Sequence, residues 1–155
     1  MLDKTKTAMG ARLMRTWVLK PLLDPMKIGK RQAAVSAFVK NPRLREELRE
    51  ELSRILDLER LTAKTVYGTA NGKDLKAIGQ SLRALPTLKS IADELGCDVI
   101  SELAGKLDTL PDLSELLETA IVENPPFFAV ILIINEINSI QVNNPKMPDS
   151  VNILI

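Results

Sequence analysis

The 155-residue sequence has no histidine and a single cysteine, Cys97. Without histidine it lacks the commonest general base, the commonest zinc ligand and the imidazole of serine and cysteine triads. One cysteine allows no internal disulfide, fits a reducing compartment, and cannot build a tetrahedral metal site without histidine. We therefore predict no catalytic, cofactor-binding or metal-binding residues in this chain, and we interpret Cys97 as a small packing residue.

Aromatic residues and long apolar runs are also scarce. Only 3% of the residues are aromatic, whereas 45% are hydrophobic, and most of these are aliphatic. This composition favours packed helices over an aromatic-rich sheet. The longest apolar run, residues 127–134, is too short to cross a bilayer, and no apolar signal core follows the first lysines. We expect a cytoplasmic chain without membrane association.

Charge is nearly balanced over the whole chain but unevenly distributed. Residues 1–31 carry eight bases and two acids, a net charge of about +6. Residues 93–123 carry nine acids and one base, a net charge of about −8. The simpler interpretation is that two oppositely charged helical segments lie close together or face solvent. The alternative is that the basic segment binds DNA phosphates, although such segments usually come with base-reading or stacking residues.

Helix start and stop signals recur along the first 126 residues. Thr7 is a candidate N-cap, and Asp24-Pro25 combines an N-cap with proline at the first helical position, beginning a helix that runs to about Lys40. Asn41-Pro42 repeats this pattern, and Asp57 is a further candidate cap. We predict an all-α fold of about seven helices, since no strand-like alternation occurs in this part.

Apolar residues at helical spacing predict which helix faces are buried. The expected sets are Leu44, Leu48, Leu52 and Ile55; Leu58, Leu61, Thr65 and Val66; Leu75, Ile78, Leu82 and Leu85; Leu88, Ile91 and Leu95; Val99, Leu103 and Leu107; and Pro111, Leu113, Leu116, Leu117 and Ile121.

The segment Gly68-Thr-Ala-Asn-Gly-Lys-Asp74 superficially resembles a phosphate-binding loop. It has three residues between the glycines where the loop needs four, and an aspartate where a hydroxyl should bind Mg²⁺. A carboxylate there would repel phosphate. We interpret the segment as a turn followed by a helix cap.

Four sequence blocks, in order, resemble the core, or lever, domain of the MutS family of DNA mismatch repair proteins. They are Leu2-Asp3-x-Thr5-x-Thr7-x-Met9-Gly10-x-Arg12-Leu13 with Arg15-x-Trp17 and Pro21-Leu22; Asn41-Pro42-x-Leu44-Arg45 with Leu56-Asp57-Leu58-Glu59-Arg60-Leu61; Asp74-Leu75 with Leu82-x-x-Leu85-Pro86-x-Leu88; and Leu116 with Ala120-Ile121 and Asn124-Pro125-Pro126. As scaffold residues, Gly10 allows close approach of a neighbouring backbone and Trp17 offers an apolar anchor.

The resemblance implies a mechanical role. In the family this domain is a helical lever between the DNA-clamping arms and the ATPase, which bind mismatched duplex DNA, ATP and Mg²⁺ in a MutS-type dimer. No residue here matches the family's mismatch-reading or ATP-binding motifs, so we expect no enzyme activity from this chain alone. Two other interpretations stay open: a free-standing helical module that binds a MutS-type partner, and DNA-backbone binding through the segment Lys4–Arg31.

The resemblance ends after Pro126. Residues 1–126 match the first half of the lever, whereas residues 127–155 form a hydrophobic and asparagine-rich tail that suggests short strands or no fixed structure. We expect a partial gene product whose tail arose from a frame change or a fusion. The family completes this domain with a segment that returns after the clamp, so without it we expect exposed apolar helix faces and self-association.

Overall fold

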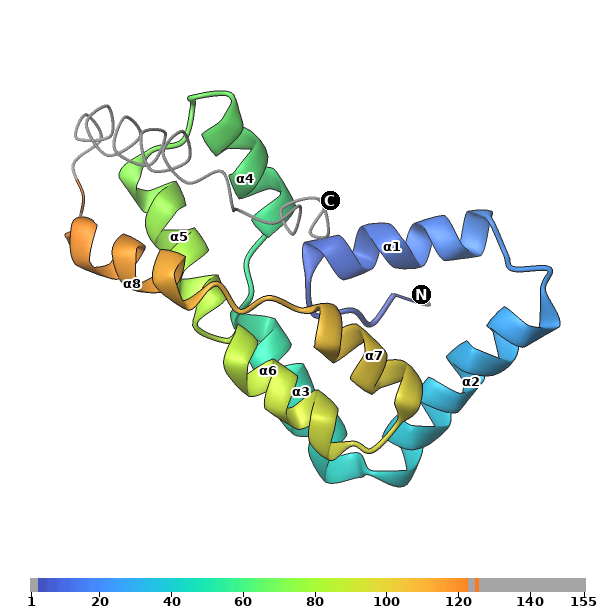
Figure 1. Cartoon of the computed structure of the whole chain (residues 1–155). Helices are drawn as coiled ribbons and strands as arrows, with labels where there is room; N and C mark the ends of the chain where they lie inside the picture. The colour runs from blue at the N-terminus through green and yellow to red at the C-terminus, as the bar shows by residue number, and fades with distance from the viewer. Residues whose placement is uncertain (1–2, 123–124, 126–155) are drawn as a thin grey trace. The chain divides into compact units, whose positions relative to one another are not determined.

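A computed structural model describes residues 3–122 and Pro125 (Figure 1). The described residues form eight helices and no strand, which confirms the all-α prediction. The helices are α1 (Ala8–Leu19), α2 (Pro25–Lys40), α3 (Pro42–Arg54), α4 (Leu58–Val66), α5 (Gly72–Leu82), α6 (Leu85–Glu94), α7 (Asp98–Lys106) and α8 (Pro111–Ala120). Leu2 of the first sequence block, Asn124, and the tail predicted for residues 127–155 lie outside the described residues.

Three helices begin where the predicted capping residues place them. The side-chain oxygens of Thr7, Asp24 and Asp57 accept backbone N–H groups of the first turns of α1, α2 and α4 at 3.0, 2.9 and 3.3 Å. Each of these bonds satisfies a backbone donor that has no partner within its helix. The expected caps of α1, α2 and α4 are thus confirmed.

Asn41 departs from the expected pattern. It is the N-cap residue of α3, but its side chain makes no capping bond there. Instead its Nδ2 donates to the carbonyl oxygen of Ala37 at 3.0 Å, at the end of α2. Asn41 is the single residue between α2 and α3, so its side chain can hydrogen-bond to the end of α2 or to the start of α3. Here it bonds to the end of α2.

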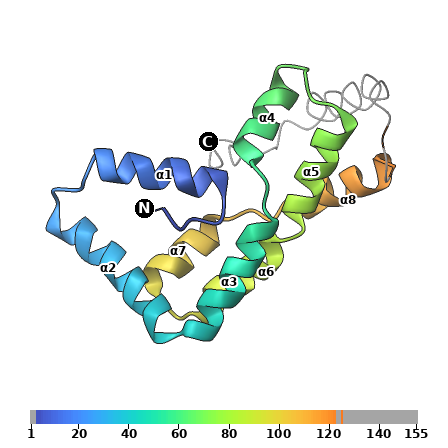
Figure 2. The ribbon, with the colours of Figure 1, turned by 180° about the vertical axis from the view of Figure 1, so that it is seen from behind.

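The chain divides into two compact units, and the first contains α1, α2, α3, α6 and α7. In unit 1, α3 packs on α2 and α6, and α7 packs on α2 and α6 (Figures 1 and 2). Its core is formed by Leu44, Ile91 and Leu95, and the partly buried residues packed against them are Ala37, Phe38, Leu48, Cys97 and Ile100. Cys97 is therefore a packing residue, as predicted. An ion pair between Arg43 and Glu94 also links α3 to α6.

One helix of unit 1 buries a different face from the one expected. The predicted stripe on α7 included Leu103, but Leu103 is 61% exposed. The core-facing residues are Ile100, which packs on the core cluster, and Ala104, which is buried. These two positions are one helical turn apart, and each lies about 100° round the helix from the neighbouring position of the predicted stripe. A small alanine at this contact lets α7 lie close to its neighbours.

Unit 2 is a smaller helical group in which α5 packs against both α4 and α8 (Figure 1). Its core is mainly apolar and contains Leu58, Leu75, Leu82, Leu117 and Ile121, together with the fully buried Ser81, whose hydroxyl donates to the Ala77 carbonyl oxygen. Val66 of α4, expected among the apolar core residues, is 75% exposed. Gly79 of α5 is buried at the contact with α8, where an added methyl group would lie 3.3 Å from Cβ of Leu117. The missing side chain therefore permits the close approach of these two helices.

Candidate functional site

The segment Gly68–Asp74 forms a turn and a helix cap, as the sequence suggested. Asn71 Oδ1 accepts the backbone N–H of Asp74 at 2.9 Å, and Asp74 Oδ2 accepts the backbone N–H of Asn71 at 3.0 Å. This reciprocal pair is a capping box at the start of α5. The carboxylate thus takes the Asn71 N–H and places a negative charge beside the turn, which does not suit a phosphate group.

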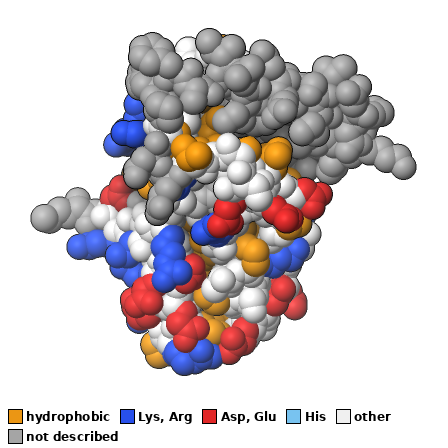
Figure 3. All heavy atoms as spheres, turned by 90° about the vertical axis from the view of Figure 1, so that its left-hand side faces the viewer, with side chains coloured by type: hydrophobic (Ala, Val, Ile, Leu, Met, Phe, Trp, Pro, Cys, Tyr) orange, Lys and Arg blue, Asp and Glu red, His pale blue; other side chains and the backbone are white. Residues whose placement is uncertain are grey.

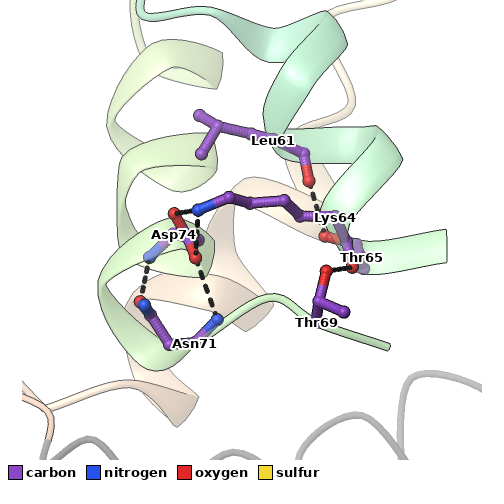
Figure 4. A network of polar contacts seen from close by, with 6 residues as sticks. All are labelled: Leu61, Lys64, Thr65, Thr69, Asn71 and Asp74. Carbon is purple, nitrogen blue, oxygen red and sulfur yellow. Dashed lines mark hydrogen bonds and ion pairs between the residues drawn. The ribbon is translucent and has the colours of Figure 1, made fainter. Parts of the chain in front are cut away.

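Asp74 also joins α4 to α5 through Lys64 (Figure 4). Lys64 Nζ donates to both carboxylate oxygens, at 2.9 and 3.1 Å, and Thr69 Oγ1 donates to the Lys64 carbonyl oxygen at 3.2 Å. The lysine lies in the last turn of α4 and the aspartate in the first turn of α5. Each charge is opposite in sign to the partial charge at its own helix end, which is favourable. This network joins the end of α4 to the start of α5.

The electrostatics of Asp74 follow from these contacts. Burial alone would raise the pKa of its carboxyl group. The hydrogen bonds from Lys64 and from the Asn71 N–H, with the positive charges of Lys64 and Arg60, outweigh that effect and lower the pKa below its usual value. Asp74 is therefore charged at neutral pH, where it accepts the Asn71 N–H and pairs with Lys64.

In unit 1, α1 and α2 form an exposed surface that we call the α1–α2 surface. The two helices bury no residue completely. They carry no acidic residue, and their six bases are Arg12, Arg15, Lys27, Lys30, Arg31 and Lys40. Their largely exposed apolar residues are Leu13, Trp17, Val18, Leu19, Met26, Val35 and Val39. An apolar surface of this kind on a helix pair indicates an interaction site.

Trp17 and Arg31 connect these two helices. The Arg31 guanidinium carbon lies 3.5 Å from the centre of the Trp17 ring, a cation–π contact. Trp17 was expected to be an apolar anchor, but it is 40% exposed. The expectation was wrong because the indole is covered by the flat guanidinium of α2 and not by a hydrophobic core. The close neighbour expected at Gly10 is likewise the Thr7 hydroxyl of the α1 cap, and not another backbone segment.

The basic and acidic segments meet at one point in unit 1. Helix α7 packs on α2, and Lys106 donates to Glu102 at 2.8 Å. That hydrogen bond lowers the pKa of the Glu102 carboxyl group, and the charge of Lys30 on α2 adds to the effect. The interpretation that oppositely charged segments lie close together therefore holds for Lys30 and Glu102. Elsewhere acidic and basic side chains intermingle over an exposed face (Figure 3).

Replacing Arg31 with alanine should uncover Trp17. We expect a red-shifted tryptophan emission, faster quenching by acrylamide, and a loss of roughly 0.5–1 kcal/mol in the free energy of unfolding. The chain has one tryptophan, so its fluorescence reports this contact directly. Arg31→Lys is the matched control, because it keeps the charge but loses the planar stacking group. An Arg31→Ala protein with wild-type emission and quenching would contradict the contact.

Among the described residues, no cluster of three or more histidine, cysteine, aspartate or glutamate side chains could bind a metal ion. No helix there is both long and apolar enough to cross a membrane.

Sequence reasoning found the cap of α5 but missed its ion pair with Lys64 and the stacking of Arg31 on Trp17. Asn71 and Asp74 stand three residues apart before an apolar stripe, and this spacing identifies a capping box. Lys64 and Arg31 have no comparable local signal. Their partners lie 10 and 14 positions away along the chain, on another helix in each case.

Comparison with known proteins finds a match to one family. The family model for MutS domain III matches residues 1–136. The chain is 43% identical over 125 residues to the DNA mismatch repair protein MutS of Symbiobacterium thermophilum, and 42% identical over 125 residues to that of Clostridium tetani. It is 41% identical over 126 residues to the protein of the same name from an Exiguobacterium species. Each alignment covers 81% of this chain but only 14–15% of the relative.

Proposed function

Because the chain belongs to the MutS family, through a match to domain III, we propose that it is a helical scaffold that couples ATPase state to DNA clamping in mismatch repair. The domain III match carries this proposal. The helical packing of each unit supports it, since packed helices can transmit a displacement between distant sites. The chain spans about one-seventh of the length of the relatives it matches.

We propose that this chain alone is not an enzyme, and that ATP, Mg²⁺ and mismatched duplex DNA bind to other segments of a MutS-type dimer. We also propose a cytoplasmic location, and residues 127–155 as a divergent tail after a domain III segment of residues 1–126. The purified chain should show no ATP hydrolysis above a buffer blank. Activity that survives repurification would overturn this part of the proposal.

A chimera tests the coupling role. Residues 1–126 would replace the aligned segment of the Symbiobacterium thermophilum MutS protein. The chimera should bind mismatched duplex, and ATP should change its affinity for that duplex as it does in the parent protein. A chimera that folds, binds the duplex and hydrolyses ATP, but in which ATP leaves DNA affinity unchanged, would refute coupling by this segment.

A second candidate function is a free-standing module that binds a MutS-type partner. The α1–α2 surface favours it, since exposed apolar side chains there have no cover within the described residues. The same exposure supports self-association of the chain. Capture of a purified full-length MutS protein by this chain supports the module, and absence of binding at micromolar concentration argues against it. A monodisperse monomer in light scattering would refute self-association.

Direct DNA-backbone binding through Lys4–Arg31 is a third and weaker candidate. Five bases of this segment lie on α1 and α2 and favour it, whereas the interspersed apolar residues of the same helices do not suit a phosphate backbone. Gel shifts with plain and mismatched duplex at several salt concentrations test this. A steep fall in affinity with salt supports phosphate contacts, and no shift at low salt excludes them.

A further inference from the structure

Charge is segregated by helix in an unusual way among the described elements. Helices α1 and α2 carry bases and no acid, whereas α8 carries three acids (Asp112, Glu115 and Glu118) and no base. Each of the other five described helices contains both signs of charge. Asp112, Glu115 and Glu118 are exposed, and the neighbouring Leu113 and Leu116 are only half-buried. Helix α8 therefore offers an acidic face bordered by leucine.

The α1–α2 surface is complementary to that face in two respects. It provides exposed bases and exposed apolar residues on shared helix faces, because Arg15 and Leu19 on α1, and Met26 and Lys30 on α2, are each four residues apart. Two copies joined through α1–α2 on both sides would place positive charge against positive charge, which is unfavourable. Duplex DNA would satisfy the bases but would leave the apolar side chains against a charged backbone. An acidic helix that also presents leucine satisfies both.

We propose that the α1–α2 surface of one copy binds α8 of a second copy. This inference rests on the self-association proposed above and identifies the two surfaces that contact each other in it. Because the two faces differ, two copies can exchange the contact reciprocally, or each copy can pass it on to a further copy. The assembly should grow with protein concentration and weaken as NaCl rises, because attraction between exposed charges is screened by salt.

Two charge-reversal variants test the proposal. The first, Arg15→Glu with Lys27→Glu, changes the basic face, and the second, Asp112→Lys with Glu115→Lys, changes the acidic face. Each alone should weaken association about tenfold or more, since attractive pairs become repulsive. The control for the first variant is Arg49→Glu with Arg54→Glu on α3, which makes the same change in net charge where acids and bases are mixed. Circular dichroism checks folding, and Arg15→Gln with Lys27→Gln replaces the first variant if it unfolds.

The decisive measurement is sedimentation of the two variants mixed in equal amounts. In the mixture the intact acidic face of one variant meets the intact basic face of the other, and the two reversed faces are also opposite in charge. The mixture should therefore recover the association that each variant alone has lost. Variants that associate like the control, or a mixture that stays monomeric, would overturn the assignment of faces while leaving self-association standing. If Arg15→Glu with Lys27→Glu lost binding to duplex DNA in gel shifts but associated like the wild type, the basic face would bind DNA and not α8. That result would also overturn the assignment. A wild-type monomer would refute self-association itself, and the chimera would still test coupling separately.

Discussion

Replacing Leu75 with alanine is expected to lower the free energy of unfolding by about 3 kcal/mol. Leu75 lies in the first half of α5 and is only 1% exposed, in the helix that packs against both α4 and α8. The substitution removes buried hydrocarbon and leaves a cavity that helices packed on two sides cannot fully close. A domain of this size is stable by only about 5–15 kcal/mol, so the loss is a large part of the total.

Urea denaturation followed by circular dichroism measures this effect. Leu103→Ala is the matched control, because it makes the same chemical change on a helix where the side chain is 61% exposed. The control should change the free energy of unfolding by no more than about 0.5 kcal/mol. Equal losses for Leu75→Ala and Leu103→Ala would mean that α5 is not the packed centre of unit 2.

Helix positions were predictable because their signals are local. Thr7, Asp24 and Asp57 cap helices through hydrogen bonds to residues two or three positions further along the chain. Such contacts depend on sequence neighbours alone, so the residue types suffice to locate them. The expected count of about seven helices is close to the eight described, and α5 and α6 are separated only by Arg83 and Ala84.

Burial was less predictable because it depends on which neighbour a helix meets. On α7, leucine and valine spacing suggested one face, but the structure packs Ile100 and Ala104 inward and leaves Leu103 exposed. A short helix with apolar residues on more than one side offers two faces of similar hydrophobicity. The small volume of Ala104, which permits close packing, then matters more than total apolar area.

The candidate site shows the same division between local and long-range information. The segment Gly68–Asp74 could be recognised as a turn and cap from its spacing, and hydrogen bonds between Asn71 and Asp74 confirm it. The charge of the α1–α2 surface was also visible in the sequence. Its exposure was not, because exposure depends on which helices cover it. Trp17 illustrates the difference, since a large apolar residue was expected to be buried and instead pairs with Arg31 at the surface.

Replacing Asp74 with alanine should be the next most damaging change, lowering the free energy of unfolding by about 2 kcal/mol. The substitution removes half of the capping box and leaves the Asn71 N–H without its acceptor. It also leaves the Lys64 ammonium, which is 34% exposed, without its carboxylate partner. The loss should exceed that of an ordinary surface ion pair, because one carboxylate satisfies both a helix end and a half-buried charge.

The pH dependence of stability distinguishes the contribution of the Asp74 charge from that of its shape and hydrogen bonds. Its pKa is lowered in the folded chain, so the stabilisation is complete above the usual aspartate pKa and disappears as the pH falls through the lower, folded-state pKa. Asp74→Asn keeps an acceptor oxygen and similar volume but loses the charge. It should therefore be less stable than the wild type at pH 7, with a deficit that narrows below about pH 4 as the wild-type carboxylate is protonated. Urea denaturation of both proteins at each pH measures this, and a deficit that stays constant on acidification would show that the Lys64–Asp74 pair contributes no charge-dependent stability.

The substitution Lys64→Met, made in the wild type and in Asp74→Asn, then isolates the contribution of the ion pair. It should lower the free energy of unfolding less in Asp74→Asn than in the wild type, since the partner charge is already absent there.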